Sequence, residues 1–172
     1  MDVERSLKAI TDEDLGVLAK LAAEDRERFY VGRPEYRSRV VCVALCQRAA
    51  LHYVDMAERA SAANGVKDFD VWSFFASVPG HRFPADRRMT HVDLGPSKFG
   101  RWTGEPPSFC HFSGRRVDML MRSLPVELGA DPADALADYL REGRTVSARR
   151  LAAKAAVLIN PIQRRGEIVW PR

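Results

Sequence analysis

The sequence has few of the features that mark membrane-spanning or secreted proteins. No apolar run approaches the length of about 20 residues that spans a bilayer. The segment Met1 to Arg5 lacks the basic-then-apolar order of a signal peptide. Cysteines are scarce and odd in number: Cys42 and Cys46 lie in an apolar stretch, and Cys110 stands apart. These features predict a reduced, cytoplasmic protein with no membrane partner.

Several metal- and nucleotide-binding motifs are also missing. The cysteines and histidines do not show the paired spacing of a zinc site. The spacing of a Walker phosphate loop is absent, and there is no internal repeat or low-complexity tract. No strand-like segment interleaves aromatic and basic residues as base stacking requires. This last absence counts against a metal-free RNA-binding domain.

The overall composition is that of an ordinary globular protein. The chain has 172 residues, of which 46% are hydrophobic and 29% are charged, so we expect one domain spanning residues 1–172. The net charge is +4 and the isoelectric point is near 9.2. A mildly basic surface suits nucleotide phosphates or RNA, but it does not require either partner.

The pattern of apolar residues predicts a mixed α/β fold. Three segments read as strands of a twisted mixed sheet, at residues 39–45, 66–75 and 115–122. A helix is expected between the first two, beginning at Gln47. His52 lies on this helix, and a lone histidine in such a place is more often structural than catalytic.

Helices are expected at both ends of the chain. An N-terminal helix from about Asp12 to Phe29 has Thr11 as a suitable N-cap. The C-terminal part, 126–160, is predicted to be helical. Its first helix is opened by Asp131 and Pro132 and ended by Gly143, and its second runs from about Ser147 to Leu158. The basic residues Arg149, Arg150 and Lys154 of the second helix are interpreted as a solvated face.

The stretch most informative about function follows the turn dipeptide Asn64-Gly65. Because side chains alternate along a strand, Asp68 and Asp70 are expected to point the same way. Two adjacent carboxylates repel each other and are costly to bury unless a cation lies between them. Mg²⁺ prefers carboxylates together with phosphate oxygens. The simpler alternative is an edge strand with a hydrated polar face.

Residues 39–122 resemble the nucleotidyltransferase superfamily, and in particular its small bacterial members. The segment from Lys67 to Val71 is similar to the part of that family which carries the first two acids, and the segment from Arg116 to Leu120 to the strand with the third. The resemblance implies that Asp68, Asp70 and Asp118 are catalytic and bind two Mg²⁺ ions. Asp93, on a short strand-like segment, is the alternative third acid.

The resemblance also implies a substrate and a reaction. A nucleoside triphosphate would transfer its nucleoside monophosphate to an acceptor, and pyrophosphate would leave. The acceptor is not identified by the resemblance and is a protein hydroxyl, an RNA or a small molecule. Asp118 is expected to assist in activating the acceptor hydroxyl.

The expected phosphate-binding residues depart from the family pattern. The family has a Gly-Gly or Gly-Ser pair after the first strand, whereas this chain reads Leu45-Cys46-Gln47-Arg48-Ala49. Arg48 is therefore expected either to bind the phosphates through its guanidinium group or to close the pocket. A second group, Ser97, Lys98 and Arg101, lies in a glycine-containing loop that fits an anion-binding site and an ordinary surface turn equally well.

The missing glycine pair also supports a different function. The fold can be retained as a binding module without catalysis, for example as one partner of a toxin–antitoxin-like pair or as an RNA binder. Loss of the glycine pair is the observation that favours this alternative.

Overall fold

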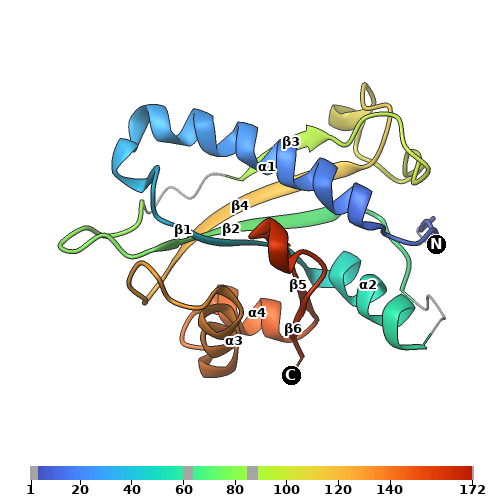
Figure 1. Ribbon diagram of the computed structural model, residues 1–172. Helices are drawn as coiled ribbons and strands as arrows, with labels where there is room; N and C mark the ends of the chain where they lie inside the picture. Colours follow the sequence, from blue (N-terminus) through green and yellow to red (C-terminus); the bar gives the residue numbers. More distant parts are fainter. Residues whose placement is uncertain (1–3, 60–63, 85–88, 172) are drawn as a thin grey trace.

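The computed structural model describes residues 4–59, 64–84 and 89–171 and confirms the α/β prediction. Within these residues, four α-helices pack on a six-stranded mixed sheet (Figure 1). The strands are β1 (Val40–Cys46), β2 (Phe69–Ala76), β3 (Thr90–Asp93), β4 (Arg116–Leu124), β5 (Ala156–Asn160) and β6 (Ile168–Trp170). The α-helices are α1 (Asp12–Gly32), α2 (Gln47–Arg59), α3 (Pro132–Glu142) and α4 (Val146–Ala152). Short 3₁₀ turns lie at Pro34–Tyr36, Pro107–Phe109 and Ile162–Arg164.

The strand order is β3-β4-β2-β1-β5-β6. The strands β2 and β4 are parallel, and every other neighbouring pair is antiparallel. A parallel pair needs a long connection, and here that connection includes β3, which returns to pair with β4. The three strands predicted from the sequence are thus β1, β2 and β4, although β2 begins at Phe69 rather than at Val66.

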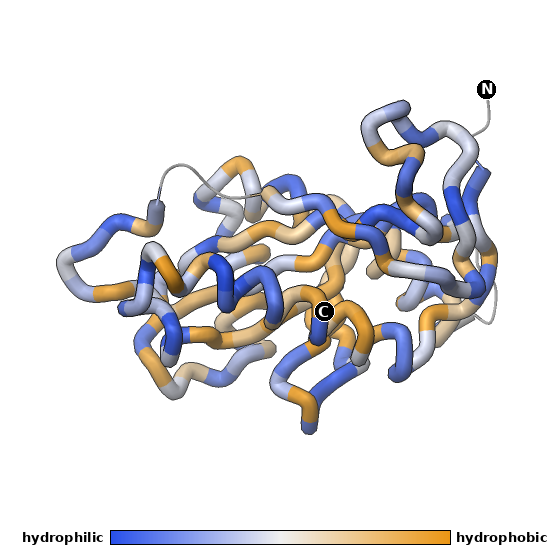
Figure 2. Tube along the Cα trace, turned by 90° about the horizontal axis from the view of Figure 1, so that it is seen from above, coloured by the Kyte–Doolittle hydropathy of each residue, from blue (hydrophilic) through white to orange (hydrophobic). Residues whose placement is uncertain are grey.

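Each face of the sheet is covered by its own pair of helices. One core contains residues of α1 and α2 with Val43, Phe69 and Val117. The other contains residues of α3 and α4 with Cys46 and Trp72. Figure 1 shows α1 on one side of the sheet and α3 and α4 on the other. The hydrophobic segments run along the strands in the middle of the fold, whereas hydrophilic segments gather at its periphery (Figure 2).

The ends of the helices follow local sequence signals. The side chain of Thr11 accepts a hydrogen bond from the backbone N–H of Asp14, whose carboxylate accepts one in return from the backbone of Thr11. This reciprocal capping satisfies donors that a helix start leaves without intrahelical partners. The Asp131 side chain caps α3 by accepting a hydrogen bond from the backbone N–H of Asp134, and Gly143 ends that helix in the left-handed conformation, as predicted.

The prediction of a helix from Ser147 to Leu158 is wrong. Helix α4 ends at Ala152, and Ala156–Asn160 forms β5, which pairs with β1. The C-terminal part is therefore helical only up to Ala152, and it contributes β5 and β6 to the sheet. A short apolar run has no periodicity that distinguishes a strand from a buried helix. The free edge of β1 decides the outcome, because β5 satisfies its backbone groups.

His52 is a structural residue, as expected. It is fully buried; its Nδ1 accepts from the backbone N–H of Gly65 at 3.0 Å, and its Nε2 lies 2.9 Å from the carbonyl oxygen of Lys8. The ring therefore ties α2 to the Asn64–Gly65 turn and to the N-terminal segment. No helix in the described residues is long and apolar enough to cross a membrane.

Candidate active site

The predicted acids gather where β2 and β4 begin. In the parallel pairing Asp70 lies directly opposite Asp118, and Asp68 immediately precedes β2. Both strand acids point to the face covered by α3 and α4, because the next residues on that face, Trp72 and Leu120, pack in that core. Asp118 is buried, and Asp68 and Asp70 are partly buried.

Arg116 lies between two of the acids. Its Nη2 donates to Asp68 Oδ2 at 2.9 Å, and its Nε lies 2.9 Å from Asp118 Oδ1. The second contact is a charge contact rather than a directed hydrogen bond, since Nε has no hydrogen-bond partner of suitable geometry among the described residues. The single guanidinium charge of Arg116 thus lies between the carboxylates of Asp68 and Asp118 and offsets part of their negative charge, and it acts on Asp70 electrostatically.

His91 on β3 completes this cluster. It is the register partner of Asp118, and its Nδ1 lies 2.6 Å from Asp118 Oδ1. The ring of Phe109 packs edge-to-face on His91, with centroids 5.3 Å apart, and lies 5.0 Å from the guanidinium carbon of Arg116. Phe109 therefore packs against both His91 and Arg116 on the side of the long connection.

The electrostatics of the cluster centre on Asp70. Burial, together with the neighbouring charges of Asp68 and Asp118, raises the pKa of Asp70 to about 7, against the opposing effect of Arg116 and Lys154. Burial also raises the pKa of Asp118, although Arg116 and His91 act in the other direction. A carboxyl whose pKa is raised by desolvation and by like charges is typical of a functional site.

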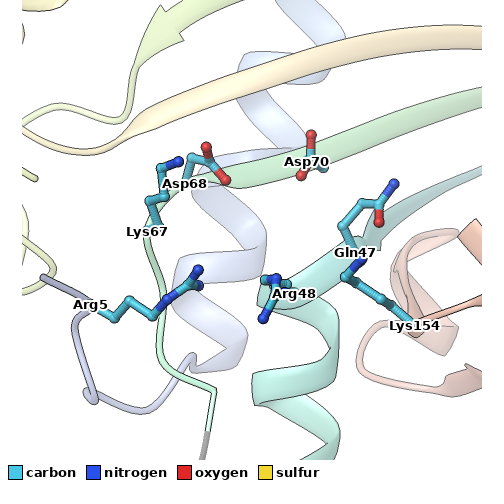
Figure 3. Close-up of a pocket in the computed structure, with 7 residues that line it drawn as sticks. All are labelled: Arg5, Gln47, Arg48, Lys67, Asp68, Asp70 and Lys154. Atoms are coloured by element: carbon cyan, nitrogen blue, oxygen red, sulfur yellow. The ribbon is translucent and has the colours of Figure 1, made fainter. Parts of the chain in front are cut away.

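A pocket of about 210 Å³ adjoins Asp68 and Asp70. It is also lined by Gln47 and by four basic residues, Arg5, Arg48, Lys67 and Lys154 (Figure 3). The basic residues come from four separate parts of the chain, and their charges outnumber those of the two acids. Such a surface suits a polyanion such as a triphosphate.

The N-terminal segment and the short segment between α4 and β5 supply cations that the sequence did not reveal. The backbones of Ser6 and Val66 exchange two hydrogen bonds, of 2.9 and 2.7 Å, which hold Arg5 beside the pocket. Lys154 follows α4 and acts on Asp70 electrostatically, so its interpretation as part of a solvated helix face is wrong. No local signal indicates either position, because each depends on the topology of the sheet.

The junction between β1 and α2 adopts a left-handed backbone conformation that is usual for glycine. Gln47 has a φ of +64° and is the one non-glycine residue with positive φ in the described part of the chain. It lies where the resembled family has its glycine pair, and it lines the pocket. A side chain in this conformation is strained, and such strain concentrates at functional sites.

Substituting Gln47 tests whether this backbone shape is imposed by the fold. We expect Gln47→Gly to leave the free energy of unfolding unchanged or to raise it by up to about 1 kcal/mol, because relief of strain offsets the greater freedom of the unfolded chain. We expect Gln47→Val to lower it by about 1–2 kcal/mol, since a β-branched residue tolerates this region poorly. Urea denaturation of both variants measures the difference. A larger loss for the glycine variant than for the valine variant would contradict the left-handed geometry.

The second predicted phosphate group lies elsewhere. Lys98 Nζ is 3.0 Å from Asp14 Oδ2 on α1, Ser97 Oγ accepts from the backbone N–H of Phe99, and Arg101 is exposed. None of these three residues is among those that line the pocket. Of the predicted phosphate-binding residues, the structure therefore brings only Arg48 to the pocket beside the acids.

Asp93, the alternative third acid, has a different role in the structure. Its carboxylate accepts backbone hydrogen bonds from Gly95, Ser113 and Gly114, at 2.7–3.0 Å. Partial burial alone would raise the pKa of Asp93, but these hydrogen bonds lower it. Asp93 thus fastens two loops together, and Asp118 is the acid that lies beside Asp70.

The side chains of the acid cluster are of the kind that binds Mg²⁺, but they are not arranged to hold the ion. Carboxylate oxygens are the ligands that Mg²⁺ prefers; burial first, and then the charges of Asp68 and Asp118, raise the pKa of Asp70, and a bound cation would oppose this rise. However, across residues 4–59, 64–84 and 89–171, no group of three or more His, Cys, Asp or Glu side chains is arranged to hold a metal ion. Arg116 supplies the positive charge between Asp68 and Asp118 instead.

Comparison of the chain with protein-family models, with curated proteins and with solved structures found no match. The resemblance to nucleotidyltransferases therefore depends on the residues and their arrangement, and it stays a prediction.

Proposed function

We propose that the protein is a cytoplasmic, Mg²⁺-dependent nucleotidyltransferase that transfers a nucleoside monophosphate from a nucleoside triphosphate to an acceptor hydroxyl. The observation that supports this most is the pairing of Asp70 with Asp118 on adjacent strands, at the rim of a pocket lined by four cations. Charge of both signs in one site is what a metal–triphosphate complex requires: carboxylates for the metal, and basic groups for the phosphates.

The residues divide into three roles. The basic side chains Arg5, Arg48, Lys67 and Lys154 neutralise the triphosphate and orient it. Asp68, Asp70 and Asp118 would hold Mg²⁺ once Arg116 has moved aside. When bound, the metal would stabilise charge on the attacking and leaving oxygens.

The reaction that follows is a substitution at the α-phosphorus. The acceptor oxygen forms a bond to that phosphorus, the bond from the α-phosphorus to the bridging oxygen breaks, and pyrophosphate leaves with its electron pair. The proton of the acceptor hydroxyl passes to the Asp118 carboxylate. His91 fixes the orientation of that carboxylate through its Nδ1 contact.

Transfer of a radiolabelled nucleotide tests the proposal. Wild-type protein, Mg²⁺ and each of the four nucleoside triphosphates are incubated with candidate protein, RNA and small-molecule acceptors. We expect transfer by the wild type and loss of transfer in Asp70→Asn, which keeps the shape of the side chain but removes its charge. Asp138→Asn, on the exposed surface of α3, is the matched control. Unchanged transfer in Asp70→Asn would rule out the role of Asp70.

A binding module without catalysis is the second candidate. Two observations favour it: Gln47 replaces glycine at the strained junction, and Arg116 pairs with two of the acids. Mg²⁺-dependent nucleotide binding, combined with no transfer to any acceptor, would favour this function over catalysis.

Arg48 and Arg101 separate the two predicted phosphate sites. We expect Arg48→Ala to weaken nucleotide binding by roughly ten- to a hundredfold, because one charge-assisted contact is lost from the pocket. Arg101→Ala removes the same charge from an exposed loop and is expected to leave the affinity unchanged. Isothermal titration of both variants with a nucleoside triphosphate measures this. Weaker binding in Arg101→Ala alone would move the phosphate site to the 95–102 loop, and tighter binding in Arg48→Ala would mean that Arg48 closes the pocket.

A further inference from the structure

A second basic groove lies on the same face of the sheet as the acids. Two adjoining pockets, of about 570 and 220 Å³, share Arg122, Ser147 and Arg150. The larger one extends between α3 and α4, and the smaller one is floored by Trp72 and Leu120. We call the two together the α4 groove. None of the described residues that line it is acidic.

One arginine of the α4 groove, Arg122, is held in place by contacts that do not neutralise its charge. Arg122 donates from Nε and Nη2 to Ser147 Oγ, at 3.1 and 2.5 Å, and its guanidinium carbon lies 5.8 Å from the centre of the Trp72 ring. Within the described part of the chain, neither Arg122 nor Arg150 forms an ion pair with a carboxylate. Ser147 accepts from Arg122 and keeps its own O–H to donate.

The acid cluster lies between the two basic regions. Asp118, Leu120 and Arg122 alternate along β4 and so share one face, with roughly 13 Å between the first and the last at about 3.3 Å per residue. The pocket of Figure 3 lies at the opposite end, beside Asp68 and Gln47. Helix α4 and the segment that follows it contribute to both regions, because Arg150 of α4 lines the groove and Lys154, beyond the end of α4, lines the pocket.

We propose that the α4 groove binds a phosphate group of the acceptor, through Arg122, Ser147 and Arg150. The identity of the ligand as the acceptor depends on the proposed function, whereas the binding of phosphate does not. Arg150 presents paired N–H donors that match phosphate oxygens, Arg122 adds its Nη1 beside the two donors that contact Ser147, and the Ser147 hydroxyl completes such a site. With the triphosphate in the first pocket, the groove lies on the other side of the acids, where the acceptor must enter.

The phosphate has two chemical sources, and the same experiment separates them. Binding of inorganic phosphate, of glucose 6-phosphate and of a single-stranded pentaribonucleotide is measured by isothermal titration to wild type, to Arg150→Gln and to Arg122→Gln/Arg150→Gln. Arg149→Gln is the matched control, since Arg149 lies on the same helix, is exposed and does not line the groove. Thermal unfolding checks that each variant is folded. The single variant keeps the contact between Arg122 and Ser147, so it remains informative if the double variant does not fold.

We expect at least one of the three probes to bind the wild type and the control equally, and to bind Arg150→Gln about tenfold more weakly. Preference for the pentaribonucleotide identifies a phosphodiester acceptor, and preference for glucose 6-phosphate identifies a phosphate monoester. Equal affinity in wild type and Arg150→Gln, or no binding of any probe to the wild type, overturns the proposal. If the probe binds Arg150→Gln more weakly but the wild type shows no nucleotidyl transfer, the phosphate site is retained and the transferase function is rejected.

Discussion

Asp70→Asn is expected to raise the free energy of unfolding at pH 8 by on the order of 2–4 kcal/mol. The folded protein holds the pKa of Asp70 at about 7, whereas the ordinary value is 3.8. Between these two values the folded state keeps a proton that the unfolded chain has lost. The stability of the wild type therefore falls as the pH rises from about 4 to 7, and it stays constant with respect to this group above about 7. Asparagine cannot ionise, so the variant escapes this loss.

Urea denaturation of wild type and Asp70→Asn at pH 4, 6 and 8 measures the effect. The difference between the two proteins should nearly vanish at pH 4 and should be largest at pH 8. Asp138→Asn, on the exposed surface of α3, controls for the loss of one negative charge. A difference between wild type and Asp70→Asn that does not change with pH would show that Asp70 ionises normally. If Asp70 is a metal ligand, Mg²⁺ at pH 8 should stabilise the wild type more than the variant.

Arg116→Met is expected to lower the free energy of unfolding by on the order of 2–4 kcal/mol at pH 8 without divalent ions. Removal of the guanidinium group leaves Asp68 and Asp118 without the cation that lies 2.9 Å from each. Methionine keeps part of the apolar stem, so the loss reports mainly on charge. Because the three acids would then have less positive charge beside them, Mg²⁺ should stabilise this variant more than it stabilises the wild type.

Unfolding in urea, with and without Mg²⁺, measures both effects. Arg141→Met is the matched control, since it breaks an exposed ion pair with Asp138 and is expected to cost less than about 1 kcal/mol. A loss in Arg116→Met no larger than that of the control would show that Arg116 does not neutralise the acids. Stabilisation by Mg²⁺ that is equal in wild type and Arg116→Met would mean that the metal does not take the place of Arg116.

The sequence predicted the parts of the fold that local patterns determine. Apolar runs identified β1, β2 and β4, and alternation along a strand predicted that Asp68 and Asp70 point the same way; both line one pocket. The capping residues Thr11 and Asp131 marked helix starts, because their signals involve residues only three positions apart. By contrast, β5 has an apolar sequence compatible with either structure, and only its distant partner β1 makes it a strand.

The candidate site was likewise predictable only where the local sequence determines it. The spacing of Asp68 and Asp70 was visible in the sequence, whereas the contacts of Arg116 with two acids depend on the parallel pairing of strands. The loop containing Lys98 has the composition of an anion site, but a carboxylate on α1 pairs with that lysine. Composition indicates which charges a loop carries, and tertiary structure determines which of them remain for a ligand.

The place of β5 beside β1 has a consequence for synthesis on the ribosome. Strand β1 lies inside the sheet, and Cys42–Cys46 is buried, yet its partner β5 begins at Ala156. At a translation rate of about 5–20 residues per second, roughly 5 to 20 seconds pass between the synthesis of β1 and the synthesis of β5. During that interval the apolar edge of β1 has no strand to cover it, so the nascent chain is most exposed to aggregation before its last strands emerge.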